Sequence, residues 1–264
     1  MPATDFLPRR LYDAFSRAGY VSELLKGLLA LMGNPEYVSF WDDFLGTRGG
    51  TWPASTPYAA VVGTGTPVIG ITQAINGTMT LTTGANSGDS AGQALGLNWS
   101  GDNGFYFIAR VKLDTLASSK FEIGLTDAVG DDGAVNLKSG PTFTATDMAV
   151  FCRDTTEDGE VTFMSNGGTT DADVDATAFD IAADTYFVVE IVGAGPTTAT
   201  GASTVGDNVA GYINGQYVGS GNITGSAPFT PWAYVETLTT ATRTLTVDYW
   251  AVVGPRNAAW GGAV

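Results

Sequence analysis

The sequence predicts an all-β sandwich preceded by a short helical arm, and three observations lead to this fold class. From about residue 38 onward, short apolar runs recur at regular intervals, as they do in sandwiches and barrels. Glycine, with 35 residues, and abundant threonine separate or fill these runs, which suits turns and strands. Strand and helix patterns do not alternate along the chain, so a parallel doubly wound sheet is disfavoured.

The first 37 residues differ from the rest, and we expect them to form a helical arm for assembly. One helix is predicted over residues 5–19, with Asp5 as its cap and Gly19 at its end. A second helix is predicted over residues 22–32, and so many of its residues are apolar that it must be covered. The arm residues expected to contact a partner are Arg9, Arg10, Leu11, Tyr12, Phe15, Leu24, Leu25, Leu28 and Leu31.

Charge separates the arm from the remainder of the chain. Residues 1–40 contain four basic and four acidic side chains, so residues 41–264 carry the whole net charge of −15. Two destinations for the neutral arm stay open at this point. It packs either on its own β domain, residues 38–264, or on another subunit or partner protein.

Strands are expected wherever a run of apolar or alternating residues lies between turn signals. The predicted ranges are 68–73, 78–83, 105–113, 120–126, 147–153, 160–165, 185–192, 209–213, 216–220, 232–238 and 243–253. Within 105–113, the even-numbered residues Tyr106 to Lys112 are expected on the face opposite the core, and this face is predicted to be half wet, that is, about half exposed to solvent. Near the C-terminus, Leu245, Val247 and Tyr249 are predicted to share one face of their strand.

A tight hairpin is the clearest local signal in the chain. Asn214-Gly215 lies between two short apolar and aromatic runs, and this pair supplies the two positive-φ positions of a type I′ turn. The order of segments from residue 183 onward resembles the concanavalin A-like (laminin G-like) jelly roll. The hairpin matches the family form Y-x-D/N-G-x-x-V, and the closing strand matches its V-D-Y/W form. The matching residues are Tyr212, Asn214, Gly215 and Val218, and then Val247, Asp248 and Tyr249.

Residues 40–52 and 87–97 resemble the opening strands of such domains in tailed-phage virion proteins. The whole resemblance covers roughly residues 40–257 and implies the fold more firmly than a function, because one fold hosts many functions.

Composition argues against several classes of function. The net charge of −15 opposes binding to nucleic acid and to anionic membranes. The chain has no histidine, so a triad with an imidazole base is excluded and common zinc sites lose their main nitrogen ligand. The single cysteine, Cys152, lies in a strand pattern and is expected to be part of the core.

Carboxylates leave two weaker possibilities open. Glu122 and Glu190 could face each other as a glycosidase pair, although lone carboxylates on strands more often lie on a solvated face. Asp171, Asp173 and Asp175 could gather a Ca²⁺ ion, with a solvated acidic loop as the favoured alternative. No cofactor is expected.

Aromatic residues keep carbohydrate binding possible. Some of the six tryptophans could be exposed and stack on sugar rings, although tryptophan more often lies in a core or an interface.

The missing catalytic equipment and the apolar arm together favour a structural role. We expect a non-enzymatic tailed-phage virion protein, most specifically a capsid decoration (cement) protein that binds the head shell through its arm. The expected partners are the major capsid protein and further copies of the chain, with a trimer implied by analogy to decoration proteins. The protein would be made in the host cytoplasm and would reside on the virion head. The alternatives are a tail-associated host-recognition protein that binds glycans through the sandwich, and a glycan-cleaving enzyme.

Overall fold

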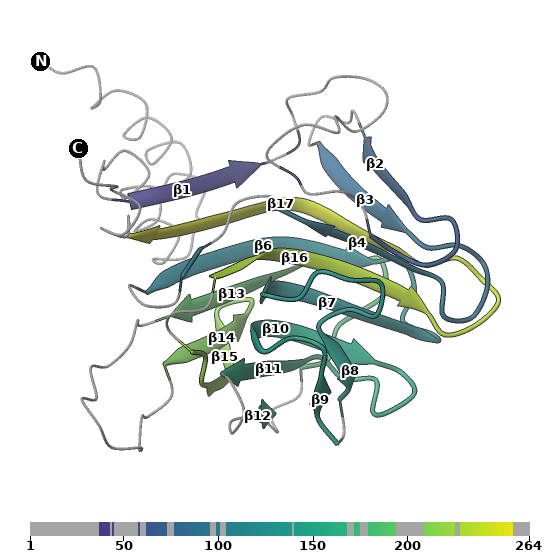
Figure 1. Cartoon of the computed structure of the whole chain (residues 1–264). Coiled ribbons are helices and arrows are strands. Elements are labelled where there is room, and N and C mark those ends of the chain that lie inside the picture. Colours follow the sequence, from purple (N-terminus) through teal and green to yellow (C-terminus); the bar gives the residue numbers. More distant parts are fainter. Residues whose placement is uncertain are drawn as a thin grey trace, which may run out of the picture.

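The computed structural model describes residues 37–42, 44, 58, 62–72, 77–95, 99–100, 104–138, 140–167, 172–174, 179–193, 208–224 and 228–255. These residues form two packed antiparallel sheets, which confirms the predicted all-β sandwich (Figure 1). The two predicted helices of the arm lie outside the described residues and stay predictions. Within the described part of the chain, no helix is long and apolar enough to cross a membrane.

The first sheet combines strands from both ends of the domain. Its members are β1 (Tyr37–Asp42), β2 (Val68–Thr72), β3 (Thr78–Thr82), β6 (Phe105–Leu113), β13 (Phe187–Gly193), β14 (Val209–Ile213), β15 (Gln216–Gly221) and β17 (Thr244–Pro255). They lie in the order β15-β14-β13-β6-β17-β3-β2, and β1 pairs with the later half of β17 (Figure 1). β17, the last strand that the structure describes, therefore lies in the interior of this sheet.

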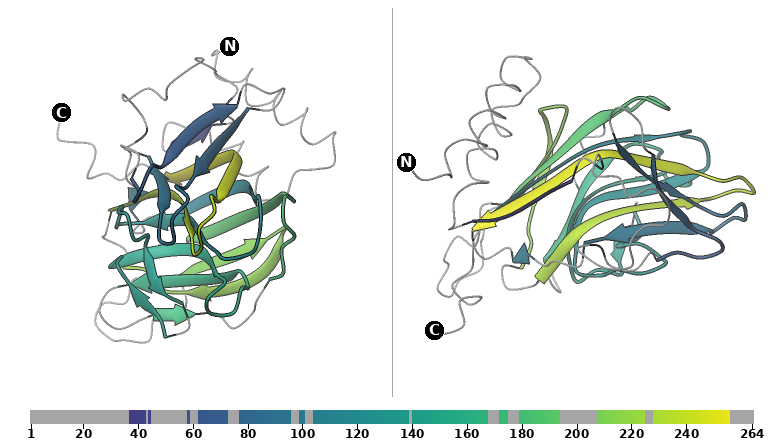
Figure 2. Two further views of the ribbon diagram at one scale, coloured as in Figure 1. Left: turned by 90° about the vertical axis from the view of Figure 1, so that its right-hand side faces the viewer. Right: turned by 90° about the horizontal axis from the view of Figure 1, so that it is seen from above.

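The second sheet lies face to face with the first. Its members are β4 (Ser90–Ala94), β5 (Trp99–Ser100), β7 (Ser119–Thr126), β10 (Asp147–Asp154), β11 (Thr162–Gly167), β12 (Ala172–Val174) and β16 (Pro228–Thr237). The order is β12-β11-β10-β7-β16-β4, with β5 beside the start of β16. A separate two-stranded sheet consists of β8 (Val135–Leu137) and β9 (Thr142–Phe143). Figure 2 shows that the long strands of the sandwich are bowed along their length.

The predicted strands agree with the observed ones to within a few residues. The range 105–113 is reproduced without change as β6, whereas β16 begins four residues before the predicted start at 232. The first half of β16 was not predicted because it contains Pro228 and Pro231. Proline lacks the backbone N–H that strand pairing uses, so its presence argues against a strand. The strands β5, β8, β9 and β12 have only two or three residues each, too few for a periodic pattern.

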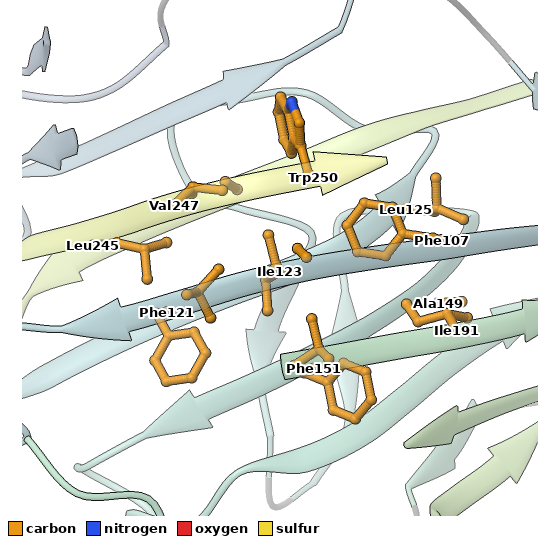
Figure 3. Close-up of a cluster of buried hydrophobic side chains, with 14 of the residues drawn as sticks. Phe107, Phe121, Ile123, Leu125, Ala149, Phe151, Ile191, Leu245, Val247 and Trp250 are labelled. Atoms are coloured by element: carbon orange, nitrogen blue, oxygen red, sulfur yellow. The ribbon is translucent and has the colours of Figure 1, made fainter. Parts of the chain in front are cut away.

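The core lies between the sheets and consists of alternate residues of their central strands. Phe107 and Ile191 of the first sheet meet Phe121, Ile123 and Phe151 of the second, and all five side chains are fully buried (Figure 3). Alternation along each strand sends the intervening residues to the two outer faces of the sandwich. Any site on the sheets must therefore lie on one of these outer faces.

A bulge in β17 changes one predicted face. Val247 and Tyr249 pair with successive residues of β6, Val111 and Arg110, so one residue of β17 is left over between them. Tyr249 consequently lies on the outer face, and Trp250, only 1% exposed, takes the next core position. The prediction that Tyr249 shares a face with Leu245 and Val247 was wrong, because an uninterrupted alternation was assumed.

The β14–β15 turn confirms the hairpin prediction. Asn214 and Gly215 have φ angles of 51° and 76°, the two positive values that a type I′ turn requires. The Asn214 side-chain oxygen accepts a hydrogen bond from the Val188 N–H at 2.9 Å, and the Asn214 N–H donates to the Val188 carbonyl at 2.8 Å. The turn is thus fixed to the neighbouring strand β13.

Candidate functional site

The outer face of the second sheet is covered by the chain that follows β7. We call residues 127–146 the covering segment; it contains β8 and β9, and residue 139 within it is not described. Ala134, Val135 and Ala145 of this segment pack on the outward side chains of β10, among them Met148 and Cys152. Cys152 is fully buried, as predicted, and burial raises the pKa of its thiol.

Glu122, a candidate catalytic residue from the sequence, ties the covering segment to the sheet. One oxygen of its carboxylate accepts hydrogen bonds from the Ala134 N–H at 2.7 Å and from the Trp232 indole N–H at 3.0 Å. The other accepts from the Val135 N–H at 3.0 Å and lies 3.5 Å from the Lys120 ammonium. Glu122 is 0% exposed, so its carboxylate serves as an anchor within the protein.

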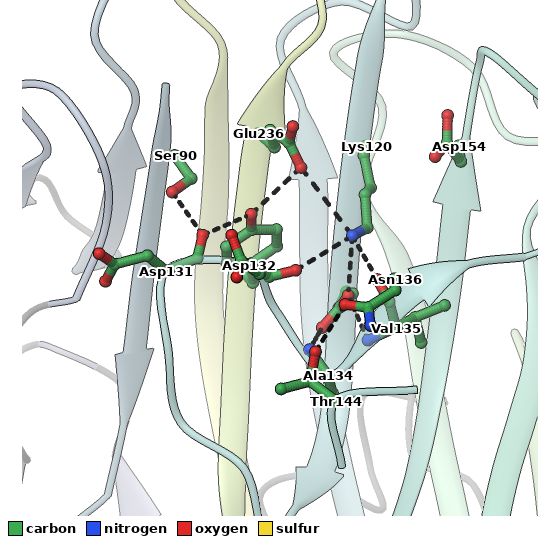
Figure 4. A network of polar contacts seen from close by, with 12 residues as sticks. Ser90, Lys120, Asp131, Asp132, Ala134, Val135, Asn136, Thr144, Asp154 and Glu236 are labelled. Carbon is green, nitrogen blue, oxygen red and sulfur yellow. Dashed lines mark hydrogen bonds and ion pairs between the residues drawn. The ribbon is translucent and has the colours of Figure 1, made fainter. Parts of the chain in front are cut away.

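Lys120 forms the second half of this buried polar cluster (Figure 4). Its ammonium donates to the Val135 carbonyl and to the Asp132 carbonyl, and lies 3.9 Å from the Glu236 carboxylate. Burial alone would lower the pKa of Lys120, but the nearby negative groups, Glu122 first, outweigh it and raise the pKa. Burial raises the pKa of Glu236 above its ordinary value.

Two aromatic rings complete the covered face. Trp232 and Tyr234 of β16 stack with ring centroids 5.8 Å apart and an angle of 19° between their planes, and both side chains are 0% exposed. The Tyr234 hydroxyl donates to the Asp131 carbonyl of the covering segment at 2.9 Å. These two rings and the carboxylates of Glu122 and Glu236 are therefore occupied by contacts within the protein.

Glu190, the other carboxylate considered from the sequence, lies on the opposite side of the molecule. Its neighbours Val189 and Ile191 in β13 belong to the core, so the Glu190 side chain lies on the outer face of the first sheet. Its carboxylate accepts a hydrogen bond from the Tyr106 hydroxyl at 2.7 Å, and the residue is 1% exposed. Glu122 and Glu190 therefore point away from each other, with both sheets between them. Both are buried, whereas the sequence favoured a solvated face for lone carboxylates on strands.

The outer face of the first sheet presents tyrosines at the end that holds the β14–β15 hairpin. We call Tyr186, Tyr212, Tyr217 and Tyr249 the tyrosine surface. The rings of Tyr212 and Tyr217 meet edge to face with centroids 5.8 Å apart. Tyr217 is 49% exposed, one of the few large apolar side chains of the described residues that solvent reaches.

A bulge in the hairpin sets the direction of Tyr217. The register between β14 and β15 shifts at Gly211/Tyr212, so Tyr217 and Ser220 lie on the same side of β15 although they are three positions apart. The Tyr217 hydroxyl donates to the Ser220 hydroxyl at 2.8 Å. The ring is therefore held in place while one side of it remains open to solvent.

Charged side chains border the tyrosines in oppositely charged pairs. Arg110 forms an ion pair with Asp248, and its guanidinium lies 4.2 Å from the centre of the Tyr186 ring. Lys112 forms an ion pair with Asp184 and lies 5.1 Å from the same ring centre. Burial raises the pKa of Tyr186, and it raises the pKa of Tyr249 to about 12, so both hydroxyls are protonated donors at neutral pH.

The remaining candidates from the sequence are placed only in part. Trp99, Trp232 and Trp250 are buried and cannot stack on a sugar. Of the three aspartates considered for Ca²⁺, Asp173 pairs through its backbone with Ser165, and Asp171 and Asp175 lie outside the described residues. In the described ranges, no three acidic or cysteine side chains are grouped so that they could hold a metal ion.

All nine predicted arm residues lie outside the described part of the chain. They are Arg9, Arg10, Leu11, Tyr12, Phe15, Leu24, Leu25, Leu28 and Leu31. Their role in contacting a partner stays a prediction. The tyrosine surface, by contrast, was not predicted; the alternation of Tyr212 with Ile213 and the Asn-Gly turn beside it were the signals that could have located it.

Comparison with known proteins identifies the fold and no family. No protein-family model and no curated protein matches this chain. The metal-free carbohydrate recognition domain of Emp46p has a TM-score of 0.52 at 8% identity, covering 80% of this chain and 94% of that chain. The protein of unknown function SO2946 from Shewanella oneidensis MR-1 has a TM-score of 0.56 at 9% identity, covering 89% and 95%.

A third similar structure comes from work on endo-acting O-glycanases that members of the human gut microbiota use to initiate mucin breakdown. It has a TM-score of 0.55 at 9% identity, covering 82% of this chain and 99% of that chain. At such identities the likeness concerns the fold alone, and it supports the concanavalin A-like jelly roll expected from the hairpin. Carbohydrate-binding and carbohydrate-cleaving proteins both occur among these neighbours.

Proposed function

We propose that this domain binds a neutral glycan on its tyrosine surface and does not cleave it. The observation that carries the proposal is Tyr217, an exposed ring supported edge-on by Tyr212 and held by a hydrogen bond to Ser220. A rigid aromatic side chain with one open side loses little conformational entropy on binding and offers an apolar plate to the C–H side of a sugar ring. The fold neighbours that bind or cleave carbohydrates are compatible with this function.

The charge of the site favours a neutral ligand over an acidic one. Arg110 and Lys112 each lie in an ion pair with an aspartate, so the surface offers polar groups without a free positive charge among the described residues. The chain as a whole carries a net charge of −15, which repels uronic acids and sulfated sugars at long range. Hydroxyl groups of a neutral glycan can exchange hydrogen bonds with the Asp184 carboxylate and with the protonated tyrosines.

The absence of cleavage is proposed from the positions of the two candidate carboxylates. A glycosidase of the common type uses two carboxylates that flank one bond, about 5–10 Å apart. Glu122 already accepts three hydrogen bonds under the covering segment, and Glu190 lies across the sandwich from it. These two residues therefore do not support a catalytic role.

The experiment is a glycan array with the labelled full chain, followed by calorimetry on the glycans that bind. Tyr217→Ala should weaken binding about tenfold or more, since central aromatic contacts dominate such interfaces, whereas Tyr217→Phe should keep most of the affinity. Leu137→Ala is the matched control, because Leu137 is 46% exposed but lies on β8, beside the other sheet. Equal affinity of all three variants, or no binding to any neutral glycan, would overturn the proposal.

Cleavage is tested with the same glycans. Incubation with the full chain should leave their chain length unchanged by mass spectrometry, and shortened products would contradict the non-enzymatic part. The virion setting and the head location expected from the sequence remain predictions. They are tested by asking whether purified protein coats undecorated capsids, or instead binds host-cell glycans as a tail protein would.

A further inference from the structure

The outer face of the first sheet contains four buried apolar side chains that are not part of the described core. They are Tyr106 and Ile108 of β6 and Ala251 and Val253 of β17, and we call them the outer apolar patch. Their exposed fractions are 8%, 1%, 2% and 2%. The face of β6 that was predicted to be half wet is divided accordingly, because Tyr106 and Ile108 are buried whereas Arg110 and Lys112 are partly exposed.

Register makes the patch continuous. Ile108 pairs with Ala251, and Tyr106 pairs with Val253, so the four side chains lie side by side on two adjacent strands. Their sequence neighbours, such as Phe107 and Val252, belong to the core on the other side of the sheet. Among the described elements, those with the most extensive contacts to β6 and β17 are their neighbours in the sheet and, across the core, β7 and β16. None of these strands lies over the outer face that carries the patch.

The chain enters the domain directly beside this patch. Tyr37, the first residue of β1, pairs with Pro255, and Ser39 pairs with Val253 of the patch. Residues 1–36 thus join the sandwich about two residues along β17 from Val253, a distance of about 7 Å at the rise of a strand. This segment needs no long connection to reach the patch.

We propose that residues 1–36 dock on the outer apolar patch of their own domain. The helix predicted over residues 22–32 would be about 16 Å long and about 10 Å wide, enough to span two strands and the pairs Ile108–Ala251 and Tyr106–Val253. Its leucines, Leu24, Leu25, Leu28 and Leu31, supply the apolar side chains that such a patch requires. Ala251 has the smallest side chain of the patch, so a helix can approach the sheet closely there.

Charge also favours this occupant. Residues 1–36 contain four basic and four acidic side chains, so this segment is neutral and is not repelled by a domain that carries −15. The four side chains of the patch are uncharged, and the carboxylate beside them, Glu190, accepts a hydrogen bond from the Tyr106 hydroxyl. Of the two destinations that the sequence left open for the arm, the structure therefore favours the chain's own domain, and this inference does not depend on glycan binding.

Photo-cross-linking on the full chain tests the proposal. Tyr106 is replaced by the photo-reactive amino acid p-benzoylphenylalanine, and cross-linked peptides are identified by mass spectrometry. We expect cross-links to residues 1–36 of the same chain, recognised because mixtures of isotope-labelled and unlabelled chains give no mixed products. The same amino acid in place of Tyr217 is the control and should give no such cross-link. Mixed products, which would indicate docking on a second copy, or cross-links only to other segments overturn the proposal.

A second measurement protects the test against a folding defect at Tyr106. Trypsin can cleave the arm after Arg17 and after Lys26, and docking should slow both cleavages. Leu28→Ser should accelerate both cleavages about tenfold. The free energy of burying one leucine side chain corresponds to at least a tenfold change in the equilibrium between the docked and the undocked arm. Glu23→Gln, a polar change in the same predicted helix, should leave the rate unchanged. Equal cleavage rates in Leu28→Ser and the unmodified chain would contradict docking.

Discussion

The two outer faces of the sandwich use similar residue types for different ends. On the second sheet, a carboxylate, a lysine and two stacked aromatic rings are sealed beneath the covering segment, and their hydrogen bonds are satisfied internally. On the first sheet, Arg110 and Lys112 border the tyrosine surface, and Tyr217 remains half exposed. Aromatic and charged residues together do not identify a binding face; their accessibility does.

The difference has an energetic basis. A buried ion such as Glu122 must have its partners, because leaving it without them costs several kcal/mol, so changes on the covered face should affect folding. A surface pair such as Lys112–Asp184 is worth little, so changes on the tyrosine surface should affect binding and leave folding nearly intact. The following expectations test this contrast, beginning with the largest effect.

Glu122→Ala should be the most destabilising of these changes. It leaves the Lys120 ammonium without its nearest carboxylate and the Ala134 and Val135 N–H groups without acceptors, and breaking such a buried pair costs about 3–5 kcal/mol. Urea denaturation should show this loss in the free energy of unfolding. Glu160→Gln, at an exposed glutamate, is the control and should change it by less than about 0.5 kcal/mol. A loss below about 1 kcal/mol for Glu122→Ala would mean that the covering segment is not anchored there.

Trp232→Phe should have the next largest effect. The change removes the indole N–H that donates to Glu122 and keeps an aromatic ring at the same buried position of the covered face. Trp99→Phe is the matched control, because the Trp99 indole N–H has no hydrogen-bond partner among the described residues. We expect Trp232→Phe to cost about 1–3 kcal/mol more than Trp99→Phe in thermal or urea unfolding, the value of a hydrogen bond to a charged acceptor. Equal costs would indicate that the bond contributes nothing.

The pH dependence of stability should separate Glu236 from exposed carboxylates. Burial raises the pKa of Glu236 in the folded state, so the folded protein holds its proton at pH values where the unfolded chain has lost it. Stability from this group is therefore present below the unfolded pKa and is lost as pH rises through the folded pKa. Relative to Glu236→Gln, the unmodified protein should become less stable as pH rises from about 4 to 7. A constant difference between the two proteins across that range would contradict the raised pKa.

Tyr217→Ala should have the smallest effect on folding of the four changes. The side chain is 49% exposed, and its loss should change the free energy of unfolding by no more than about 0.5–1 kcal/mol. The same variant should lose most of its glycan affinity. Denaturation and calorimetry on one preparation give both values. If Tyr217→Ala instead unfolds the protein, the hairpin is a structural part of the sandwich, and the contrast between the two faces fails.

Strand positions could be predicted from the sequence because alternation and turn residues are local signals. Asn214-Gly215 fixed its turn by φ preference alone, and β6 could be placed to the residue. The bulges in β17 and β15 could not be predicted, because one extra residue hardly changes the composition of a strand. The extra residue nevertheless moves every side chain beyond it to the opposite face of the sheet.

The candidate sites were harder to predict than the fold. Glu122 gave no sign in the sequence that its carboxylate is buried, because the three N–H groups that donate to it come from 12 to 110 residues further along the chain. Tyr249 was expected to share a face with Leu245 and Val247, and the bulge in β17 places it on the opposite face. Site chemistry thus depended on long-range pairing, which local patterns do not encode.

The position of β17 has a consequence for the order in which the protein can fold. This strand lies between β6 on one side and β3 and β1 on the other, and the contact between Arg110 and Asp248 spans 138 residues of chain. Pairing over such separations makes folding slow, because a long loop must close before the contacts stabilise it. The strands made first have open edges until residue 255 has left the ribosome, so the nascent chain depends on late completion and is open to misassembly until then.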